Sequence, residues 1–500
     1  MKLKKVISSI LLLAAALFLF TTCRSEPQAP NFEETLKEIN SSHIEQTEKV
    51  PALDINDCIF KTNDQSYRDS EFTEAELDEL TNYSRSGLYT VMTPTQACED
   101  VTLAFRLWKE YYGCYHYFGQ ESFEKAQENI LAEINSAGES INSTDLAKIL
   151  LKNLGFVQDG HFAINGQNTL PRTEYYSNEK IEFWKDKHGY FTTAYGNKRY
   201  ITAISGSESP EDWMKLSIST EGELIYHIGT LSDQKITQVK VSFKDGDETI
   251  ALAPPLTVDY SQNQTFSESE SNGIPVVTSG SFAVSDQKKF ESFAQTADTI
   301  KNSPVAILNL RGNGGGMMNY VEMWLDRYDN ALTSMAEGNS YASLNTGGQM
   351  YLLAKFAQHR GFLPSNVTNY LIDSSKYKEP YWEVTANQAF VHCSNDHILF
   401  VLVDQYTCSA AEHLVAALLN KENVILVGTN TSGSLLGEGS INAVLPNSHI
   451  DLMFGNVIHL YYDDTVFTEL SGFAPDIWVN GDAVQSVLNL ISYYQLDTKQ

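Results

Sequence analysis

The stretch from Asp396 to Gly437 constrains the fold of this chain more than any other. Its apolar run, Ile398 to Val403, predicts a fully buried strand, and apolar residues at helical spacing follow it. Ser409 lies between the two, at the turn from strand to helix. Strands and helices alternate in this way from Pro275 onward, and such alternation is typical of an α/β fold. We therefore predict an α/β domain over residues 275–500.

Two interpretations of Ser409 follow from its position. Its hydroxyl would lie near unpaired backbone N–H groups and the positive end of a helix dipole, where an oxyanion formed by nucleophilic attack is stabilised. Alternatively, Ser409 and Glu412 have the spacing of a capping box, in which each residue satisfies a backbone N–H of the other and does no chemistry. On this stretch alone, capping is the better interpretation.

Three further regions precede the α/β domain. Residues 1–22 place lysines before an apolar run, which is the layout of a secretory signal peptide. Residues 23–70 are polar and weakly periodic, and we interpret them as a tether. Residues 71–155 carry apolar side chains at helical spacing and predict a helical bundle. Residues 156–258 consist of short alternating runs separated by turn residues, and predict a β-rich middle domain.

The end of the signal peptide also suggests how the chain is retained after export. Phe20-Thr21-Thr22-Cys23 is similar to the lipoprotein box of bacteria, which implies a lipid on Cys23. We therefore expect a lipoprotein exported to the bacterial cell envelope, in the periplasm or on the outer surface. The lipid anchor would be its only contact with the membrane.

Composition excludes several classes of function. The net charge of −28 leaves no basic stripe for nucleic acid, so we expect no nucleic-acid partner. The eleven histidines contain no H-E-x-x-H motif and the six cysteines no C-x-x-C pair, so a zinc peptidase, a zinc ribbon and a thioredoxin motif have no support. Cys408 stands beside Ser409, but a free cysteine is more often a small buried apolar residue than a nucleophile.

A glycine-rich block, Asn309 to Gly316, closes one buried strand and opens a helix. Glycines there let the backbone approach a ligand closely and point N–H groups at an anion. The block lacks the spacing and the lysine of a phosphate-binding loop. Its alternative interpretation is a tight turn between strand and helix.

Four stretches occur in the order and at the approximate spacing of the signature blocks of one family. They are Asp159–His161, Asn309–Gly316, Cys408–Glu412 with Val427–Gly428 and Thr431–Gly433, and Glu469–Asp476. Together they resemble the C-terminal-processing and tricorn-core serine peptidases, the tail-specific protease superfamily, in its tricorn-like branch. The resemblance implies a crotonase-like catalytic core of the ClpP/crotonase type. The β-rich middle domain lies where this family often carries a PDZ domain, which takes peptide ends by strand addition.

The resemblance also implies roles for single residues. Ser409 matches the nucleophile, His161 the general base of the tricorn-like branch, and Glu469 the acidic residue that helps to orient the base. Serine is a poor nucleophile until a base takes its proton, and the base needs a partner that fixes its tautomer. The oxyanion hole would come from backbone N–H groups, those of Ala410, Gly314 and Gly315.

Two departures from the family pattern bear on this mechanism. The processing proteases have a lysine base 25 residues after the nucleophile, where this chain has Ser434, so a Ser–Lys dyad is not available. Tricorn has a serine before its histidine, linking histidine to acid, where this chain has Gly160. Asp159 could substitute for that link, although an Asp-Gly pair is more often a turn.

We therefore predict an exported serine peptidase or endopeptidase that hydrolyses peptide or protein substrates through an acyl-enzyme on Ser409. Neither a metal nor an organic cofactor is needed for this chemistry. The missing lysine and serine motivate an alternative, a catalytically inactive peptide-binding protein of the cell surface on the same fold. A crotonase-type acyl-thioester enzyme shares the fold, but export would separate it from coenzyme A.

Overall fold

The computed structural model describes most of the chain beyond its first 29 residues. The described residues are 30–47, 53–62, 72–194, 196–256, 260, 266–283, 287–329, 340–376, 378–385, 392–461 and 466–496. The predicted signal peptide and Cys23 lie outside them. Within these ranges, no helix is both long and apolar enough to cross a membrane.

The α/β core is built on a six-stranded sheet in the order β12-β13-β14-β17-β18-β25. The antiparallel β12 stands at one edge, and the other five strands run parallel. Every residue of β14 and β18 is buried, because helices cover both faces. The bounds are β12 Ser267–Ser271, β13 Ile274–Thr278, β14 Val305–Asn309, β17 Ile398–Val403, β18 Val424–Gly428 and β25 Ile477–Trp478.

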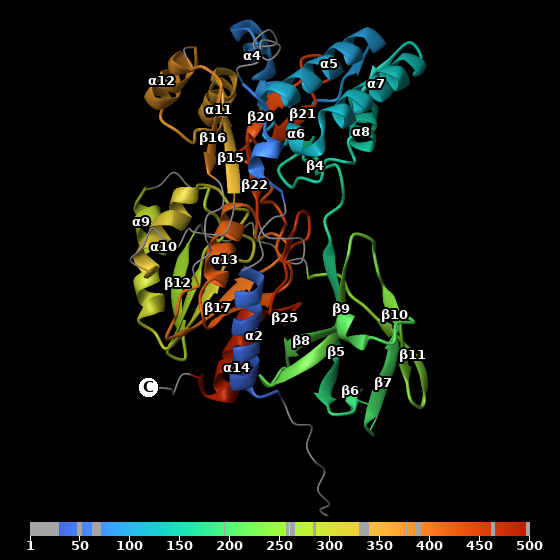
Figure 1. The fold of residues 1–500 in the computed structure, drawn as a ribbon, viewed down its shortest axis with the longest axis vertical. Coiled ribbons are helices and arrows are strands. Elements are labelled where there is room, and N and C mark those ends of the chain that lie inside the picture. Colours follow the sequence, from blue (N-terminus) through green and yellow to red (C-terminus); the bar gives the residue numbers. More distant parts are fainter. Residues whose placement is uncertain are drawn as a thin grey trace, which may run out of the picture.

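Alternate side chains of the strands point to two different apolar layers. Leu308 and Val401 pack under α9 (Gln287–Lys301), α10 (Met318–Asp329) and α13 (Ala410–Leu419). Ile307 and Phe400 pack on the opposite face under α14 (Ala483–Tyr494) and α2 (Phe32–Thr47), which lie side by side at the far end from the helical bundle (Figure 1). The predicted α/β class is therefore confirmed.

Helix α2 corrects part of the predicted tether. Residues 32–47 are not a loose arm, since Phe32, Ile39 and His43 are buried against the core. These three side chains recur at seven and four residues, so they share one helix face. His43 Nε2 lies 2.9 Å from Asp476 Oδ1, next to β25. Most other residues of this helix are polar, so the sequence showed only weak apolar periodicity and the helix was not predicted.

The helical bundle and the carboxyl-terminal part of the chain share one core (Figure 1). Threonine side chains cap two of its helices, because Thr73 with Glu76, and Thr93 with Gln96, each form a capping box. Short helical and strand segments complete the bundle. The bounds are η1 Ile55–Cys58, α4 Glu74–Leu80, η2 Tyr83–Arg85, β1 Val91–Met92, α5 Pro94–Tyr111, α6 Tyr115–Phe118, α7 Gln120–Ser136, β2 Ile141–Asn142 and α8 Ser143–Asn153.

Immediately after the bundle, the chain forms a short hairpin that joins distant strands. β3 (Ala163–Ile164) and β4 (Gln167–Asn168) extend the sheet of β20 (Ile441–Val444) and β21 (Asp451–Phe454). This pairing brings the Asp159–His161 segment against the carboxyl-terminal third of the chain. A further four-stranded sheet contains β15 Ser340–Asn345, β16 Tyr381–Thr385, β19 Gly437–Glu438 and β22 Val457–Leu460. Helices α11 Gly347–Arg360 and α12 Ser365–Ser375 lie between β15 and β16 in the chain. The short strands β23 Phe467–Thr468 and β24 Gly472–Phe473 pair with each other.

The middle of the chain forms a separate seven-stranded antiparallel sheet in the order β11-β10-β7-β6-β5-β9-β8, drawn in green beside the core (Figure 1). Ser217 Oγ donates to the Trp478 carbonyl at 2.6 Å and so attaches β8 to β25. The described residues of this region contain strands and one 3-10 turn but no α-helix, and a PDZ-like module stays a prediction. The bounds are β5 Glu174–Asp186, β6 Gly189–Thr192, β7 Arg199–Ile204, η3 Pro210–Asp212, β8 Met214–Ile218, β9 Leu224–Ser232, β10 Gln238–Phe243 and β11 Gly246–Ala251.

Candidate active site

Ser409 lies at the sharp turn between β17 and α13, with φ 55° and ψ −123°. A positive φ is unusual for a residue with a side chain and costs of the order of 1–3 kcal/mol, so the surroundings must impose it. Gly315 of the glycine-rich block packs directly against this turn. A Cβ atom on Gly315 would lie 2.8 Å from Ser409 Cβ and 2.6 Å from the Cys408 carbonyl oxygen. Only glycine allows the block to approach Ser409 this closely.

His161 lies beside Ser409 although 248 residues separate them in the chain. Its Nε2 is 3.1 Å from Ser409 Oγ, which is within the distance that a general base needs. Burial lowers the pKa of His161, while the charges of Asp159 and Glu438 act in the opposite direction. The lowered pKa favours neutral imidazole at neutral pH, the form that can accept a proton.

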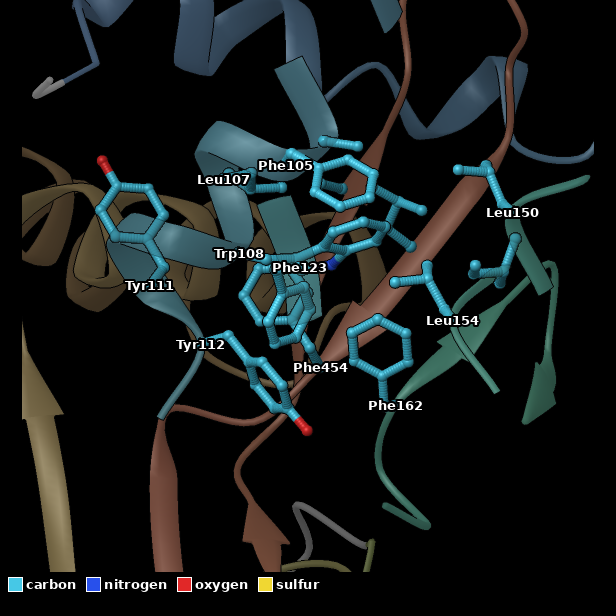
Figure 2. Packing of buried hydrophobic residues seen from close by; sticks show 14 of the residues in the cluster. Phe105, Leu107, Trp108, Tyr111, Tyr112, Phe123, Leu150, Leu154, Phe162 and Phe454 are labelled. Atoms are coloured by element: carbon cyan, nitrogen blue, oxygen red, sulfur yellow. The ribbon is translucent and has the colours of Figure 1, made fainter. Parts of the chain in front are cut away.

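Packing and hydrogen bonds hold the backbone on both sides of His161. Phe162 packs against Trp108 and Tyr112, with ring centroids 5.1 and 5.2 Å apart, inside the aromatic cluster of the bundle (Figure 2). The Tyr112 hydroxyl donates to Asp159 Oδ2 at 2.6 Å. Asp159 Oδ1 in turn accepts the His161 backbone N–H at 2.7 Å. The helical bundle therefore positions the histidine through two neighbouring residues.

Glu469 does not play the expected part of orienting the imidazole. Its Oε1 accepts the Gly160 backbone N–H at 2.7 Å, and its Oε2 accepts the N–H groups of Leu435 and Leu436 at 3.1 and 3.0 Å. His161 Nδ1 is buried without a hydrogen-bond partner among the described residues. Glu469 thus joins the loop that carries His161 to the loop at Leu435 and Leu436, and makes no hydrogen bond to the imidazole ring.

The space around Gly160 explains why no linking serine can stand there. A Cβ atom on Gly160 would lie 2.1 Å from Ser434 Oγ and 2.7 Å from the Gly433 carbonyl oxygen. Ser434, at the position where the processing proteases have lysine, therefore fills the volume that a side chain at 160 would need. The two departures from the family pattern, Gly160 and Ser434, are therefore sterically linked, because the Ser434 side chain requires a glycine at position 160.

Two buried carboxyl groups lie close together behind the histidine. Burial raises the pKa of Asp159, and burial together with the charge of Asp159 raises the pKa of Glu469 well above its usual range. Two neighbouring carboxylates in a dry environment disfavour each other's ionisation. Each of the two carboxyl groups therefore ionises less readily than an isolated carboxyl group does.

The Glu412 carboxylate holds the turn that carries Ser409 by accepting backbone hydrogen bonds. Its Oε2 accepts the Ser409 backbone N–H at 3.0 Å, as one half of a capping box does. The same buried carboxyl accepts Thr431 Oγ1 at 2.6 Å and the Gly433 N–H at 2.7 Å. Ser409 and Glu412 thus form the predicted capping box, and Ser409 Oγ also lies 3.1 Å from His161 Nε2, so the cap position is compatible with a reactive hydroxyl.

The candidate oxyanion donors differ in availability. The Gly315 N–H is engaged, because it donates to Asn313 Oδ1 at 3.0 Å, which corrects its expected role. Neither the Ala410 N–H nor the Gly314 N–H has an acceptor within the described part of the chain. A Cβ atom built on Gly315 would lie 3.0 Å from the Ala410 nitrogen, so the glycine block borders this donor.

Two residues of the site carried no signal in the sequence. Arg172, between the hairpin and the middle sheet, donates to the Gly160 carbonyl at 3.1 Å and also contacts Ser432. Arg172 therefore joins the loop at Gly160 to the loop at Ser432. Tyr112 lies in a run of bundle aromatics and differs from them only by its contact with Asp159. Each acts through a tertiary contact that residue spacing does not reveal.

An apolar pocket of about 540 Å³ opens beside the glycine block. Gly316 and Met317 border it on the side of the nucleophile turn. Much of the remaining wall is apolar and comes from β15, from α11 and from the segment that follows α11, including Leu344, Leu353, Ala357, Phe362 and Leu363. Such a lining suits an aliphatic or aromatic side chain.

One cluster in the described ranges has the composition of a metal site. His413 of α13, Glu438 of β19 and His459 of β22 bring two ring nitrogens and a carboxylate oxygen within 4.8 Å of one another. The predicted absence of a metal rested on sequence motifs, and these three residues belong to none of them.

Comparison with known proteins gives a family match over the α/β domain. Residues 273–479 match the model of peptidase family S41. No curated protein matches the sequence. Similar solved structures include mature CPAF in complex with lactacystin (10% identity, 81% of this chain and 99% of that chain covered, TM-score 0.41) and the photosystem II D1 C-terminal processing protease (13%, 81% and 98%, 0.34). A third is a peptidase described as putative from Parabacteroides merdae (15%, 80% and 97%, 0.36).

Proposed function

We propose that the chain is a serine-type peptidase of family S41, whose model matches residues 273–479, and that it acts through a Ser409–His161 dyad. The observation that carries the proposal is the 3.1 Å contact between His161 Nε2 and Ser409 Oγ. We assign the surrounding sheet and helices to a crotonase-like core, with Ser409 at the turn between buried strand and helix.

The chemistry follows from the geometry of these two side chains. His161 Nε2 takes the hydroxyl proton while Ser409 Oγ bonds to the peptide carbonyl carbon, and the Ala410 and Gly314 N–H groups receive the developing oxyanion. The C–N bond then breaks and His161 returns its proton to the leaving amine. Water attacks the ester with His161 again as base, which releases the acid and restores Ser409.

No group hydrogen-bonds His161 Nδ1 within the described residues, so the imidazolium is stabilised differently from that of a triad. The charge of Asp159 favours the protonated ring through space. The same carboxyl group accepts the His161 backbone N–H, and this hydrogen bond holds the backbone from which the ring projects. Among the described residues, the dyad therefore supplies a base without a third side chain hydrogen-bonded to its Nδ1.

A fluorophosphonate probe tests this proposal, because it bonds only to an activated serine. We expect the folded wild type to be labelled, Ser409→Ala not to be labelled, and His161→Gln to be labelled at least about 100-fold more slowly. Cys408→Ala is the matched control at the adjacent position and should be labelled like the wild type. Absence of labelling in the folded wild type would favour the inactive peptide-binding alternative.

The apolar pocket points to the class of side chain that the substrate presents. Because the pocket borders the glycine block, we infer that it receives a side chain of a peptide whose carbonyl lies at Ser409. We propose that peptides with a large apolar residue there are preferred. In a series of fluorogenic peptides, leucine or phenylalanine should give at least about 10-fold higher kcat/KM than aspartate. Equal rates across the series would contradict a role for the pocket.

Export and lipid attachment at Cys23 complete the proposal. They rest on the apolar run of residues 1–22 and on the box that ends at Cys23. Metabolic labelling with a radioactive fatty acid should mark the wild type and leave Cys23→Ala unmarked. A labelled variant would disprove attachment at this position.

A further inference from the structure

A second cluster of titratable side chains lies behind the nucleophile helix. His413 is one turn along α13 from Ser409, and its Nε2 contacts Glu438 Oε1. His459 Nδ1 lies 2.6 Å from the same carboxylate oxygen. The three residues come from α13, β19 and β22, so only the folded chain brings them together. The His413 backbone N–H donates to the Ser409 carbonyl at 3.1 Å, but neither imidazole takes a part in the proposed peptide hydrolysis.

The cluster is largely buried but can be reached from solvent. The side chains of His413 and His459 are 4% and 6% exposed and that of Glu438 is 19% exposed, which leaves a path from solvent through the carboxylate. His459 Nε2 is buried without a hydrogen-bond partner in the described part of the chain. Tyr461 packs against both imidazole rings.

Two imidazoles and one carboxylate form a donor set that binds borderline transition ions. Hard ions such as calcium and magnesium prefer sites made of oxygen ligands alone. Three protein ligands also leave a coordination position for water, and the exposed edge of Glu438 provides room for it. The donor set therefore selects zinc-like ions.

We propose that His413 Nε2, Glu438 Oε1 and His459 Nδ1 are the protein ligands of a zinc ion. On binding, the ion takes the place of any proton on His413 Nε2 or His459 Nδ1. That proton moves through solvent to the other ring nitrogen or to bulk water. The ion then joins the nucleophile helix to β19 and β22. Its role is to hold the start of α13 against the strands that follow the 431–434 loop.

Zinc titration of the full chain, stripped of metal with a chelator, tests the site directly. Calorimetry in competition with a chromophoric chelator should give one ion per chain with submicromolar Kd, and zinc should raise Tm. Glu438→Gln, which is isosteric, and His459→Asn, which keeps a polar atom near Nδ1, should each weaken binding by about 100-fold or more. Circular dichroism shows whether each variant is folded.

Two controls distinguish this site from other histidines. His392→Gln removes a histidine that lies 3.8 Å from Glu422 and belongs to no cluster of three ligating groups among the described residues, and this variant should bind zinc like the wild type. His161→Gln should also keep wild-type affinity, which separates the cluster from the dyad. The proposal is overturned if the wild type binds no zinc, if Glu438→Gln and His459→Asn bind as tightly as wild type, or if His161→Gln abolishes binding. These readouts do not depend on peptidase activity.

Discussion

The two halves of the proposed dyad are held in place by different means. The Ser409 turn is fixed by backbone geometry: a positive φ, the close approach of Gly315 and the Glu412 carboxyl on its N–H. His161 is fixed by side chains from distant elements, through the Tyr112–Asp159 contact and the burial of Phe162. Damage to the nucleophile side should therefore abolish activity abruptly, whereas damage to the base side should alter it by degrees.

The largest effect in this comparison is expected for Gly315→Ala. The new Cβ would meet Cys408 and Ser409 at less than 3 Å, and φ at Gly315 is +82°, so the turn must move. We expect kcat/KM to fall by about 100-fold or more and stability by about 1–3 kcal/mol. Gly314→Ala is the matched control, because its Cβ would meet no atom within 4 Å and its N–H remains. Equal activities of the two variants would contradict backbone control of the nucleophile.

An intermediate effect is expected for Asp159→Asn, on the base side. The Asp159 charge opposes the lowering of the His161 pKa by burial, so its removal should lower that pKa further. His161 acts as a base only when neutral, and activity is lost as pH falls through its pKa. The acidic limb of the kcat/KM profile, already expected below pH 6.5 from burial, should therefore move to lower pH.

The profile of Asp159→Asn should be compared with that of Asp145→Asn, which changes an exposed carboxyl on α8. The control should leave the acidic limb in place. A limb that stays fixed in Asp159→Asn, or moves to higher pH, would show that Asp159 does not act on the charge of His161.

The smallest effect on rate is expected for Tyr112→Phe. The variant keeps the aromatic packing around Phe162 and removes only the hydroxyl that donates to Asp159. Loss of one hydrogen bond to a buried carboxyl should cost about 1–3 kcal/mol of stability, measured by denaturant unfolding, and reduce kcat/KM by less than about 10-fold. Tyr89→Phe, at an exposed position, should change neither. A large rate loss with unchanged stability would place Tyr112 in the chemistry itself.

The sequence located the nucleophile side better than the base side, for a physical reason. Ser409, Gly315 and Glu412 lie in short local blocks at the ends of buried strands, where apolar runs and glycines mark the turn. His161 was found only through a family resemblance, because a histidine in a short strand region has no distinctive local pattern. Glu469 was correctly placed near His161 but contacts backbone N–H groups, a distinction that depends on tertiary geometry.

Other features lay beyond what residue patterns can indicate. Helix α2 was interpreted as tether because its apolar stripe is narrow and the rest of its surface is polar. The His413–Glu438–His459 cluster draws its members from three elements and matches no ligand spacing. In each case the deciding contact joins residues far apart in the chain.

The mutual exclusion between Gly160 and Ser434 limits how this dyad could change during evolution. A serine at position 160 would collide with the Ser434 side chain and also with the Gly433 carbonyl, so a single substitution at 160 would be harmful until the facing loop had moved. The cost of the change at 160 therefore depends on the residue and backbone opposite. We therefore expect a serine at position 160 to be tolerated only together with changes in the 433–434 segment that faces it.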